Sequence, residues 1–181
     1  PADAVRAVHA IGKRPFGESY VREGEAKRAA LADLAALAWR LIGPVPSTPA
    51  ARAARAFDAV ESVDRLDIAR RLSDARAEAR RTQPLDVLVQ VNISGEAQKR
   101  GVRAEDALPL AREVARLPAL ALRGFMGIAA PDVGEHAARA QFRALKSCFD
   151  AALEAGLRVD TLSMGMSADL EAAIAEGATE V

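Results

Sequence analysis

Short apolar segments alternate along this chain with longer helical segments, and this alternation restricts the fold more than any other feature. The clearest apolar segment covers residues 85–93, a nearly continuous run that begins at Leu85 and ends at Ile93. Its β-branched residues and its lack of polar alternation are typical of a parallel strand that is buried on both faces. We therefore predict a strand in the centre of a parallel sheet.

Six further segments are candidate strands, which makes seven in all: residues 14–17, 38–43, 59–63, 122–129, 159–164 and 179–181. Between them, apolar residues recur every three or four positions, as on one face of a helix. This spacing predicts helices over residues 3–10 and 21–38, after Asp64, before Leu117 and before Gly156. The proline-rich segment 42–56 predicts a loop, with no regular helix until after Pro49.

Regular alternation of strands and helices, without a hairpin signal, leaves a doubly wound sheet or a (β/α) barrel. No G-x-G-x-x-G follows an early strand, whereas polar, glycine-bearing sequences follow nearly every strand, as the loops at one rim of a barrel do. We predict an α/β fold, a TIM-type (β/α)8 barrel, as a single domain over residues 1–181. A complete barrel has eight strands and about 250 residues. We therefore expect the barrel to be truncated at both ends, without its first strand and the end of its last.

Charge and composition exclude several classes of function. The 25 Lys and Arg residues balance 25 Asp and Glu residues, and only 4% of residues are aromatic, which argues against a nucleic-acid partner. No apolar run approaches the roughly 18 residues that a membrane span needs. The single cysteine, Cys148, excludes an intramolecular disulfide framework and fits a reducing compartment. We expect a cytoplasmic monomer with neither nucleic acid nor a membrane as partner.

The sequence lacks most of the motifs that identify common catalytic and metal sites. His9 and His136 lack metal-ligand spacing, so no metal site is predicted. There is neither a nucleophile elbow nor a P-loop. The arginines of residues 70–81 alternate with acidic residues, which predicts a solvated helix face. Cys148 is predicted to be a core residue of its helix.

Two polar segments at strand ends are candidate ligand sites. In residues 161–171, Ser167 is the predicted N-cap of a helix whose free amide groups form a natural phosphate site. An ordinary helix cap has the same residues, so a purely structural role stays open. Asn92 follows the best strand, where it either faces a ligand or belongs to a turn made by Ser94 and Gly95.

Several motifs together resemble one known family, and their order and spacing match it over nearly the whole chain. The sequences that carry the resemblance are Phe-Gly-Glu-Ser-Tyr-Val at 16–21, Leu-Ile-Gly at 41–43, Ser-Val-Asp at 62–64, Val-Asn-Ile-Ser-Gly-Glu at 91–96, Gly-Phe-Met-Gly-Ile at 124–128 and Leu-Ser-Met-Gly-Met-Ser-Ala-Asp at 162–169. They resemble the pyridoxal phosphate homeostasis protein family. The resemblance implies a fold like that of the amino-terminal barrel of alanine racemase, present as a stand-alone domain. It also implies binding of pyridoxal 5'-phosphate (PLP) and a role in vitamin B6 and amino-acid homeostasis, without an established reaction.

The resemblance also implies site residues. Ser167 would contact the phosphate, Met164 and Asn92 would lie near the ring, Gly165 would allow close backbone approach, and Ser163 would belong to the same site. The family's Schiff-base lysine lies in a Val-Ser-Lys-like sequence on the first strand, which would precede Pro1.

Parts of the family pattern are missing from these residues. None of Lys13, Lys27, Lys99 and Lys146 has the context of the Schiff-base lysine. The family's Arg-Ile-Gly-Thr-like segment would follow Val181. We therefore expect residues 1–181 to bind PLP weakly or not at all.

The chain departs from the family between Trp39 and Pro49, where the usual His, Gln, Asn and Lys are replaced, and at Ser19, where Asn is common. Three functions remain open. The first is a non-catalytic PLP carrier or buffer that supplies PLP-dependent recipient enzymes. The second is an alanine-racemase-like PLP enzyme, and the third is a barrel that has lost cofactor binding. We favour the first.

Overall fold

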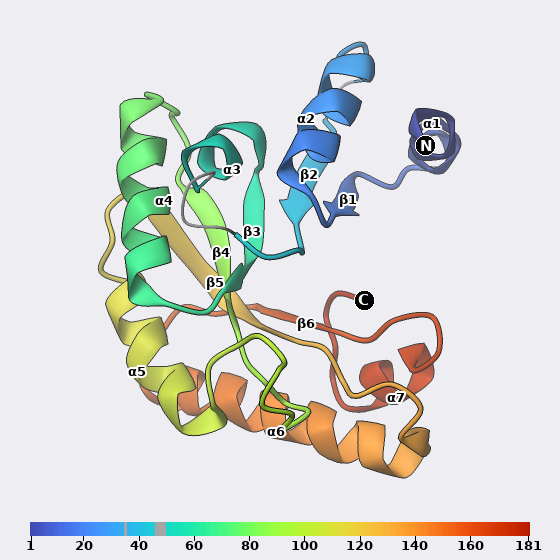
Figure 1. Ribbon diagram of the computed structural model, residues 1–181, viewed down its shortest axis with the longest axis vertical. Coiled ribbons are helices and arrows are strands. Elements are labelled where there is room, and N and C mark those ends of the chain that lie inside the picture. Colours follow the sequence, from blue (N-terminus) through green and yellow to red (C-terminus); the bar gives the residue numbers. More distant parts are fainter. Residues whose placement is uncertain (35, 46–49) are drawn as a thin grey trace.

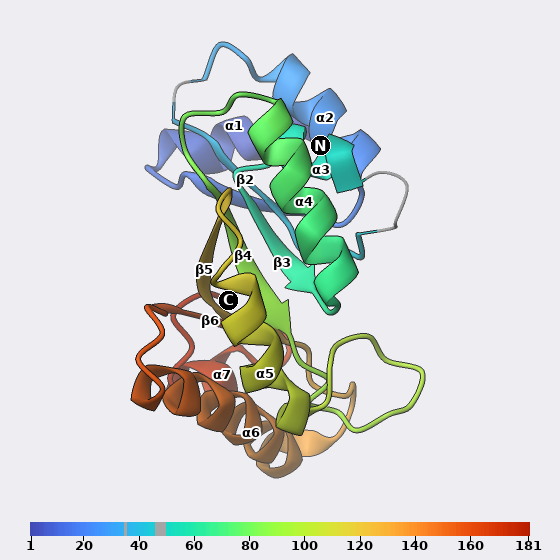
Figure 2. The ribbon, with the colours of Figure 1, turned by 90° about the vertical axis from the view of Figure 1, so that its left-hand side faces the viewer.

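The computed structural model describes residues 1–34, 36–45 and 50–181, which form one curled parallel sheet with helices along its outer face (Figures 1 and 2). The strands are β1 (Pro15–Glu18), β2 (Ala38–Leu41), β3 (Ala59–Val63), β4 (Leu85–Gln90), β5 (Leu120–Gly127) and β6 (Thr161–Met164). The helices are α1 (Ala2–Ala10), α2 (Val21–Ala30), α3 (Ala50–Ala56), α4 (Leu66–Glu78), α5 (Ala104–Val114), α6 (Gly134–Glu154) and α7 (Leu170–Ala175).

The strand order decides between the two predicted architectures. Each strand pairs in parallel with the next one along the chain, in the order β1-β2-β3-β4-β5-β6. A doubly wound sheet reverses its strand order at a central crevice, whereas a barrel adds each strand on the same side. The barrel-type fold is therefore confirmed, as a curled sheet of six strands within the described residues.

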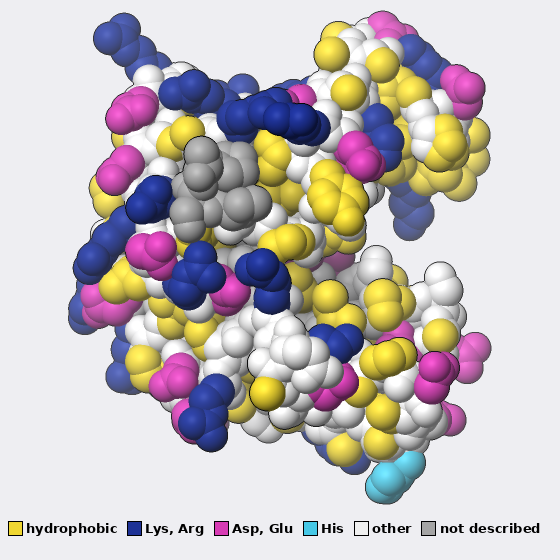
Figure 3. Space-filling view, viewed as in Figure 1, with side chains coloured by type: hydrophobic (Ala, Val, Ile, Leu, Met, Phe, Trp, Pro, Cys, Tyr) yellow, Lys and Arg dark blue, Asp and Glu magenta, His cyan; other side chains and the backbone are white. Residues whose placement is uncertain are grey.

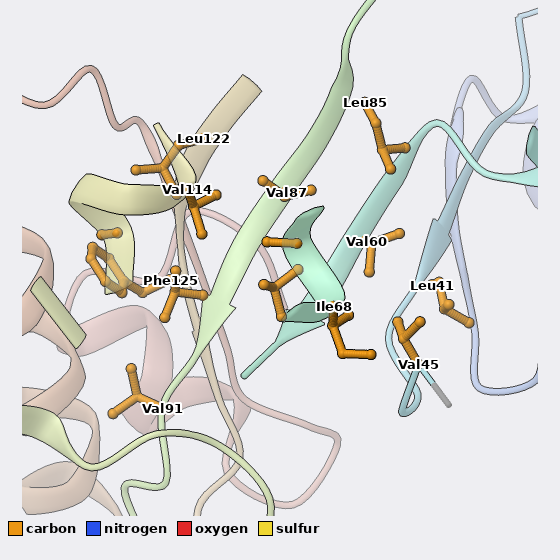
Figure 4. Packing of buried hydrophobic residues seen from close by; sticks show 14 of the residues in the cluster. Leu41, Val45, Val60, Ile68, Leu85, Val87, Val91, Val114, Leu122 and Phe125 are labelled. Atoms are coloured by element: carbon orange, nitrogen blue, oxygen red, sulfur yellow. The ribbon is translucent and has the colours of Figure 1, made fainter. Parts of the chain in front are cut away.

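The apolar core lies between the sheet and its helices. Leu41, Val60, Val87 and Leu122 stand opposite one another on successive strands and form a row on the outer face. Figure 4 shows this row beside side chains of the covering helices, such as Ile68 of α4. Burial of one aliphatic side chain of this kind contributes about 1.5–3 kcal/mol. The predicted central strand is confirmed, because β4 lies between β3 and β5 and its outer face is fully covered.

Two predicted elements are shorter in the structure. Helix α2 ends at Ala30 rather than at residue 38, because the chain turns after Leu31 and Ala36 adopts a φ of 61°. Leu34 and Leu37 still pack against the core, so their spacing reflects burial and not a continuous helix. The seventh candidate strand forms only an isolated parallel bridge, from Glu180 to Ser163.

The loop prediction for residues 42–56 is correct up to Val45, and α3 begins at Ala50, directly after Pro49. Residues 46–49, which include most of the departure from the family after Trp39, lie outside the described residues. Cys148 is buried, as predicted, and burial raises the pKa of its thiol. Within the described residues, no helix is both long enough and apolar enough to cross a membrane.

The prediction of a solvated arginine face on α4 is wrong for Arg76, which is 4% exposed. Its guanidinium donates hydrogen bonds to the carbonyl oxygens of Ala54 (2.8 Å), Phe57 (3.1 Å) and Gln83 (3.1 Å). The alternation of charges along the sequence does not reveal that the end of α3 lies against this side of α4. Arg70 and Arg71 are exposed, as predicted.

Candidate functional site

A pocket of about 640 Å³ opens at the carboxyl ends of β5 and β6. Its walls are the loop after β5, residues 129–135, and the loop after β6 together with the start of α7, residues 166–172. The carboxyl end of the strands is the edge at which barrels bind their ligands. Ser167 lines this pocket, as the sequence pattern predicts.

Ser167 is not the N-cap of α7, so that part of the prediction is wrong. The helix begins at Leu170, and its N-cap residue is Asp169. The Asp169 carboxylate accepts a hydrogen bond from the Met166 amide at 2.6 Å, while the Asp169 amide donates to the Met166 carbonyl at 3.1 Å. These two bonds close a turn at Ser167 and Ala168, and the turn delays the start of the helix by two residues.

The turn leaves three hydrogen-bond donors exposed to the pocket. The amide groups of Ser167 and Ala168 and the Ser167 hydroxyl donate no hydrogen bond within the described residues. Adjacent free donors of this kind suit the oxygen atoms of a phosphate. Of the groups in PLP, the phosphate is the one that such donors could hold.

The charge of the pocket opposes a phosphate. Its lining residues include Asp132, Glu135, Asp169 and Glu171, and none of its lining residues is Lys or Arg. A phosphate at Ser167 would therefore depend on hydrogen bonds, because the described lining residues supply no compensating positive charge.

Met164 and Gly165 connect β6 to this loop. Met164 is buried, and Gly165 has a φ of 100°. A Cβ atom at Gly165 would lie 2.5 Å from the Cβ of Ala173. The glycine thus lets α7 pack against the end of β6, a structural reason for it that holds without any ligand. Contact of either residue with a cofactor stays a prediction.

Asn92 uses its side chain within its own loop. Its Nδ2 donates to the Glu96 carbonyl at 2.9 Å, and its Oδ1 accepts from the Ser94 hydroxyl and the Gly95 amide, both at 3.1 Å. Asn92 is not among the residues that line the pocket at Ser167. The structure therefore shows the turn that the sequence left open as one interpretation, and a ligand contact of Asn92 stays a prediction.

The sequence predicts no role for Arg40, Glu61 or Glu180, which meet Ser163 in the concave interior of the sheet. Arg40 pairs with Glu61 at 2.5 Å and with Glu180 at 2.7 Å, and the Ser163 hydroxyl donates to Glu61 at 2.6 Å. The available signal was a charged residue inside each of two mainly apolar strands, Arg40 in β2 and Glu61 in β3. Sequence spacing alone did not show that they would meet.

A second depression, of about 460 Å³, opens nearby beside the first residues of β1 and β6, with Arg40 of β2 and Arg123 of β5 in its lining. Figure 3 shows the surface hollowed on the side where β1 and the C-terminal segment approach each other. Arg40 and Glu180 line this depression too. The interior cluster therefore has a solvent path at the end of the sheet away from Ser167.

Asp86 on β4 lies near this interior and gives a prediction for stability. Its carboxylate accepts no hydrogen bond within the described residues, and burial raises its pKa although Arg123 and Arg40 act in the opposite direction. Because its pKa is higher in the folded than in the unfolded state, the cost of ionising it is absent below its unfolded pKa of about 3.9. That cost grows as the pH rises and is complete above the folded pKa.

We expect Asp86→Asn to raise the free energy of unfolding at pH 7, because the neutral amide carries no cost of ionisation. Urea unfolding at about pH 7 and about pH 4 should show this gain shrinking at the lower pH. Asp74→Asn, on the exposed side of α4, is the matched control and should change stability at neither pH. A gain that is equal at both pH values would contradict the assignment.

Comparisons with known proteins place this fold in a family. The family described as "Alanine racemase, N-terminal domain" matches residues 2–181. The pyridoxal phosphate homeostasis protein of Pseudomonas aeruginosa is 50% identical over 181 residues, which are 100% of this chain and 76% of the relative. The chain belongs to the pyridoxal phosphate homeostasis protein family. The protein of the same name from Escherichia coli is 43% identical and is covered to 77%.

Solved structures agree with this family. The structure of PipY from Synechococcus elongatus with PLP bound has a TM-score of 0.89 at 33% identity, over 99% of this chain and 84% of PipY. An alanine racemase from Clostridium difficile has a TM-score of 0.78 at 17% identity, over 92% of this chain and 42% of the racemase. At that identity the racemase shows the fold alone.

Proposed function

We propose that this chain binds PLP at the carboxyl ends of its strands and serves vitamin B6 and amino-acid homeostasis by carrying or buffering the cofactor. The observation that carries the proposal is the PLP-bound structure of PipY, which covers 99% of this chain at 33% identity. The names of the relatives from P. aeruginosa and E. coli support it. PLP itself supplies an aldehyde and an electron-withdrawing pyridine ring.

We propose that the turn at Ser167 and Ala168 holds the phosphate through its three free donors. Gly165 and Met164 would set the turn at the end of β6, and Ser163 would anchor the strand. The four carboxylates of the pocket would weaken this interaction and favour release of the cofactor. Reversible binding suits a protein that passes PLP on to recipient enzymes.

We also propose that none of the four lysines forms an aldimine with this PLP. Three of them pair with nearby carboxylates: Lys27 with Glu18 at 2.5 Å, Lys99 with Glu96 at 3.8 Å and Lys146 with Asp150 at 2.5 Å. Lys13 lies in the segment between α1 and β1, and no lysine lines the pocket at Ser167. Without an aldimine, binding to residues 1–181 depends on the phosphate and is weak.

A carrier is favoured over a racemase by the names of the relatives, which are homeostasis proteins. Racemisation needs a proton donor and a proton acceptor on opposite faces of the substrate carbon. The described residues that line the pocket offer carboxylates for this role but no Lys, His, Tyr or Cys. We expect no racemisation of alanine in the presence of PLP.

The function is tested by fluorescence titration of the protein with PLP, together with an assay of alanine racemisation. We expect saturable binding, no new aldimine absorption band and no racemisation. Ser167→Ala should weaken binding about five- to tenfold, because it removes one hydrogen bond to a charged group. Ser147→Ala, on the exposed side of α6, is the control and should bind PLP as the unchanged protein does.

Each alternative has its own result. Unchanged PLP affinity in Ser167→Ala, with the circular dichroism spectrum intact, would remove Ser167 from the site. Racemisation would establish the enzyme, and the absence of PLP binding in a polypeptide that also carries the first-strand lysine would establish the barrel that has lost its cofactor.

A further inference from the structure

Glu61 is the centre of a buried polar cluster that joins three strands and the segment after α7. One carboxylate oxygen, Oε1, accepts from Arg40 Nε at 2.5 Å, and the other, Oε2, accepts from the Ser163 hydroxyl at 2.6 Å. The Arg40 guanidinium also reaches Glu180 at 2.7 Å. The Glu61 side chain is 2% exposed, so its carboxylate is buried.

Strand alternation explains why these groups meet. Leu41, Val60 and Leu162 point outward into the buried layer beneath the helices. Their neighbours Arg40, Glu61 and Ser163 therefore point to the opposite, concave face. The curl of the sheet brings β3 and β6 together there, although Glu61 and Ser163 are 102 residues apart in the sequence.

Ser163 is the last inward-facing residue of β6 before the loop at Ser167. Met164 and Gly165 follow it, and the Met164 amide donates to the Glu180 carbonyl at 3.1 Å. The side chain of Ser163 and the backbone after it are thus both attached to the Arg40–Glu61–Glu180 cluster. The position from which the loop starts depends on this attachment.

We propose that Glu61 is a positioning residue, which acts through Ser163 to hold the loop 165–169 in the conformation that presents its free donors to the pocket. Arg40 fixes the orientation of the Glu61 carboxylate, so that one oxygen is always directed at Ser163. The test has two arms. The first measures PLP affinity and rests on the proposed function, whereas the second measures amide hydrogen exchange in the PLP-free protein and does not.

The first arm measures PLP affinity in Glu61→Ala, Ser163→Ala and the double variant. Each single change should weaken binding about tenfold, the usual effect of losing a buried hydrogen bond to a charged group. Because Glu61 acts through Ser163, the double variant should bind no more weakly than the weaker single variant. Losses that multiply in the double variant would overturn the route through Ser163.

Glu61→Gln is the conservative variant. Its amide retains an oxygen for Arg40 and a nitrogen that can donate to the Ser163 hydroxyl. It should restore most of the affinity that Glu61→Ala loses. A loss as large in Glu61→Gln as in Glu61→Ala would overturn the proposal, since it would show that charge and not the bond to Ser163 matters.

The second arm measures amide hydrogen exchange in the PLP-free protein. Exchange at the Met166 and Asp169 amides, which are hydrogen-bonded within the loop, should become about tenfold faster in Ser163→Ala, while residues 87–89 of β4 keep their rates. Arg123→Gln is the matched control, because it breaks an exposed ion pair with Asp160 at the other end of β6. It should change neither the exchange of the loop nor PLP affinity.

The two arms separate the possible failures. If residues 1–181 do not bind PLP, loop exchange alone decides the role of Glu61, and the proposed function is decided by a polypeptide that also carries the first-strand lysine. If the unchanged protein binds PLP and Ser163→Ala alters neither affinity nor loop exchange, the positioning role is wrong and the proposed function stands.

Discussion

Gly124→Ala is expected to cost roughly 3–5 kcal/mol of the free energy of unfolding, a large part of the roughly 5–15 kcal/mol that a typical folded protein has. Gly124 lies in β5 with a φ of 152°, opposite Thr161 of β6. A Cβ atom there would lie 1.8 Å from the Thr161 carbonyl oxygen and 2.8 Å from its carbon. Both atoms are backbone, so relief requires the two strands to separate.

The local register explains why a glycine is needed at this point. Val87 of β4 stands opposite Leu122, and Leu88 stands opposite Gly124, so Arg123 is an extra residue in β5. Such a bulge bends a strand and brings its backbone close to a neighbour. The Asp160 amide, just before β6, donates to the Arg123 carbonyl at 2.8 Å and holds this approach.

Urea unfolding measures the effect, with Gly156→Ala as the matched control. Gly156 also has a positive φ, 79°, but a Cβ atom there would have no neighbour within 4 Å. Its replacement should cost only about 1 kcal/mol, the conformational penalty alone. Equal losses in the two variants would show that the contact with Thr161 does not matter.

Arg76→Met is expected to lower the free energy of unfolding by roughly 3 kcal/mol or more, because it leaves several buried carbonyl groups without a donor. The clearest case is the Ala54 carbonyl near the end of α3. The Asp58 amide, which would reach it if the helix continued, donates instead to the Trp39 carbonyl at 2.8 Å. Arg76 supplies the missing hydrogen bond and a positive charge at the negative end of α3.

Thermal and urea unfolding of Arg76→Met test this role, and Arg70→Met on the exposed face of the same helix is the control. The control should change stability by about 0.5 kcal/mol or less. Arg76→Lys should fall between the two, since its single ammonium group cannot reach all the carbonyls at once. A loss in Arg76→Met no larger than that of the control would contradict the capping role.

Much of the fold was predictable, because each helix or strand has a characteristic spacing of apolar residues that lie close together in the sequence. The β-branched run from Leu85 identified the central strand, and Gly156 marked the end of a helix correctly. The strand–helix rhythm, together with the absence of a dinucleotide-binding glycine pattern, favoured a barrel-type fold. The same reasoning extended α2 too far, because Leu34 and Leu37 are buried by a turn and keep a helical spacing without forming a helix.

The candidate site was predictable only in outline. Barrels bind their ligands at the carboxyl ends of the strands, and this rule placed Ser167 after β6, where the pocket lies. The sequence pattern predicted the wrong N-cap, because Ser167 and Asp169 are both good capping residues. The hydrogen bond that Asp169 accepts from the Met166 amide decides between them. Asn92 is a similar case, since a side chain that completes its own turn has the same sequence as one that faces a ligand.

Local patterns along the chain were therefore enough for the order and type of the elements and for the rim at which a ligand would bind. They were not enough for Arg76, for Gly124 or for the cluster at Glu61. Each of these depends on contacts between segments that the chain itself separates, by 102 residues between Glu61 and Ser163. Periodicity shows which face of a helix or strand is apolar. Only the curl of the sheet brings two distant polar positions together, and their burial there makes the hydrogen bond between them important for the structure.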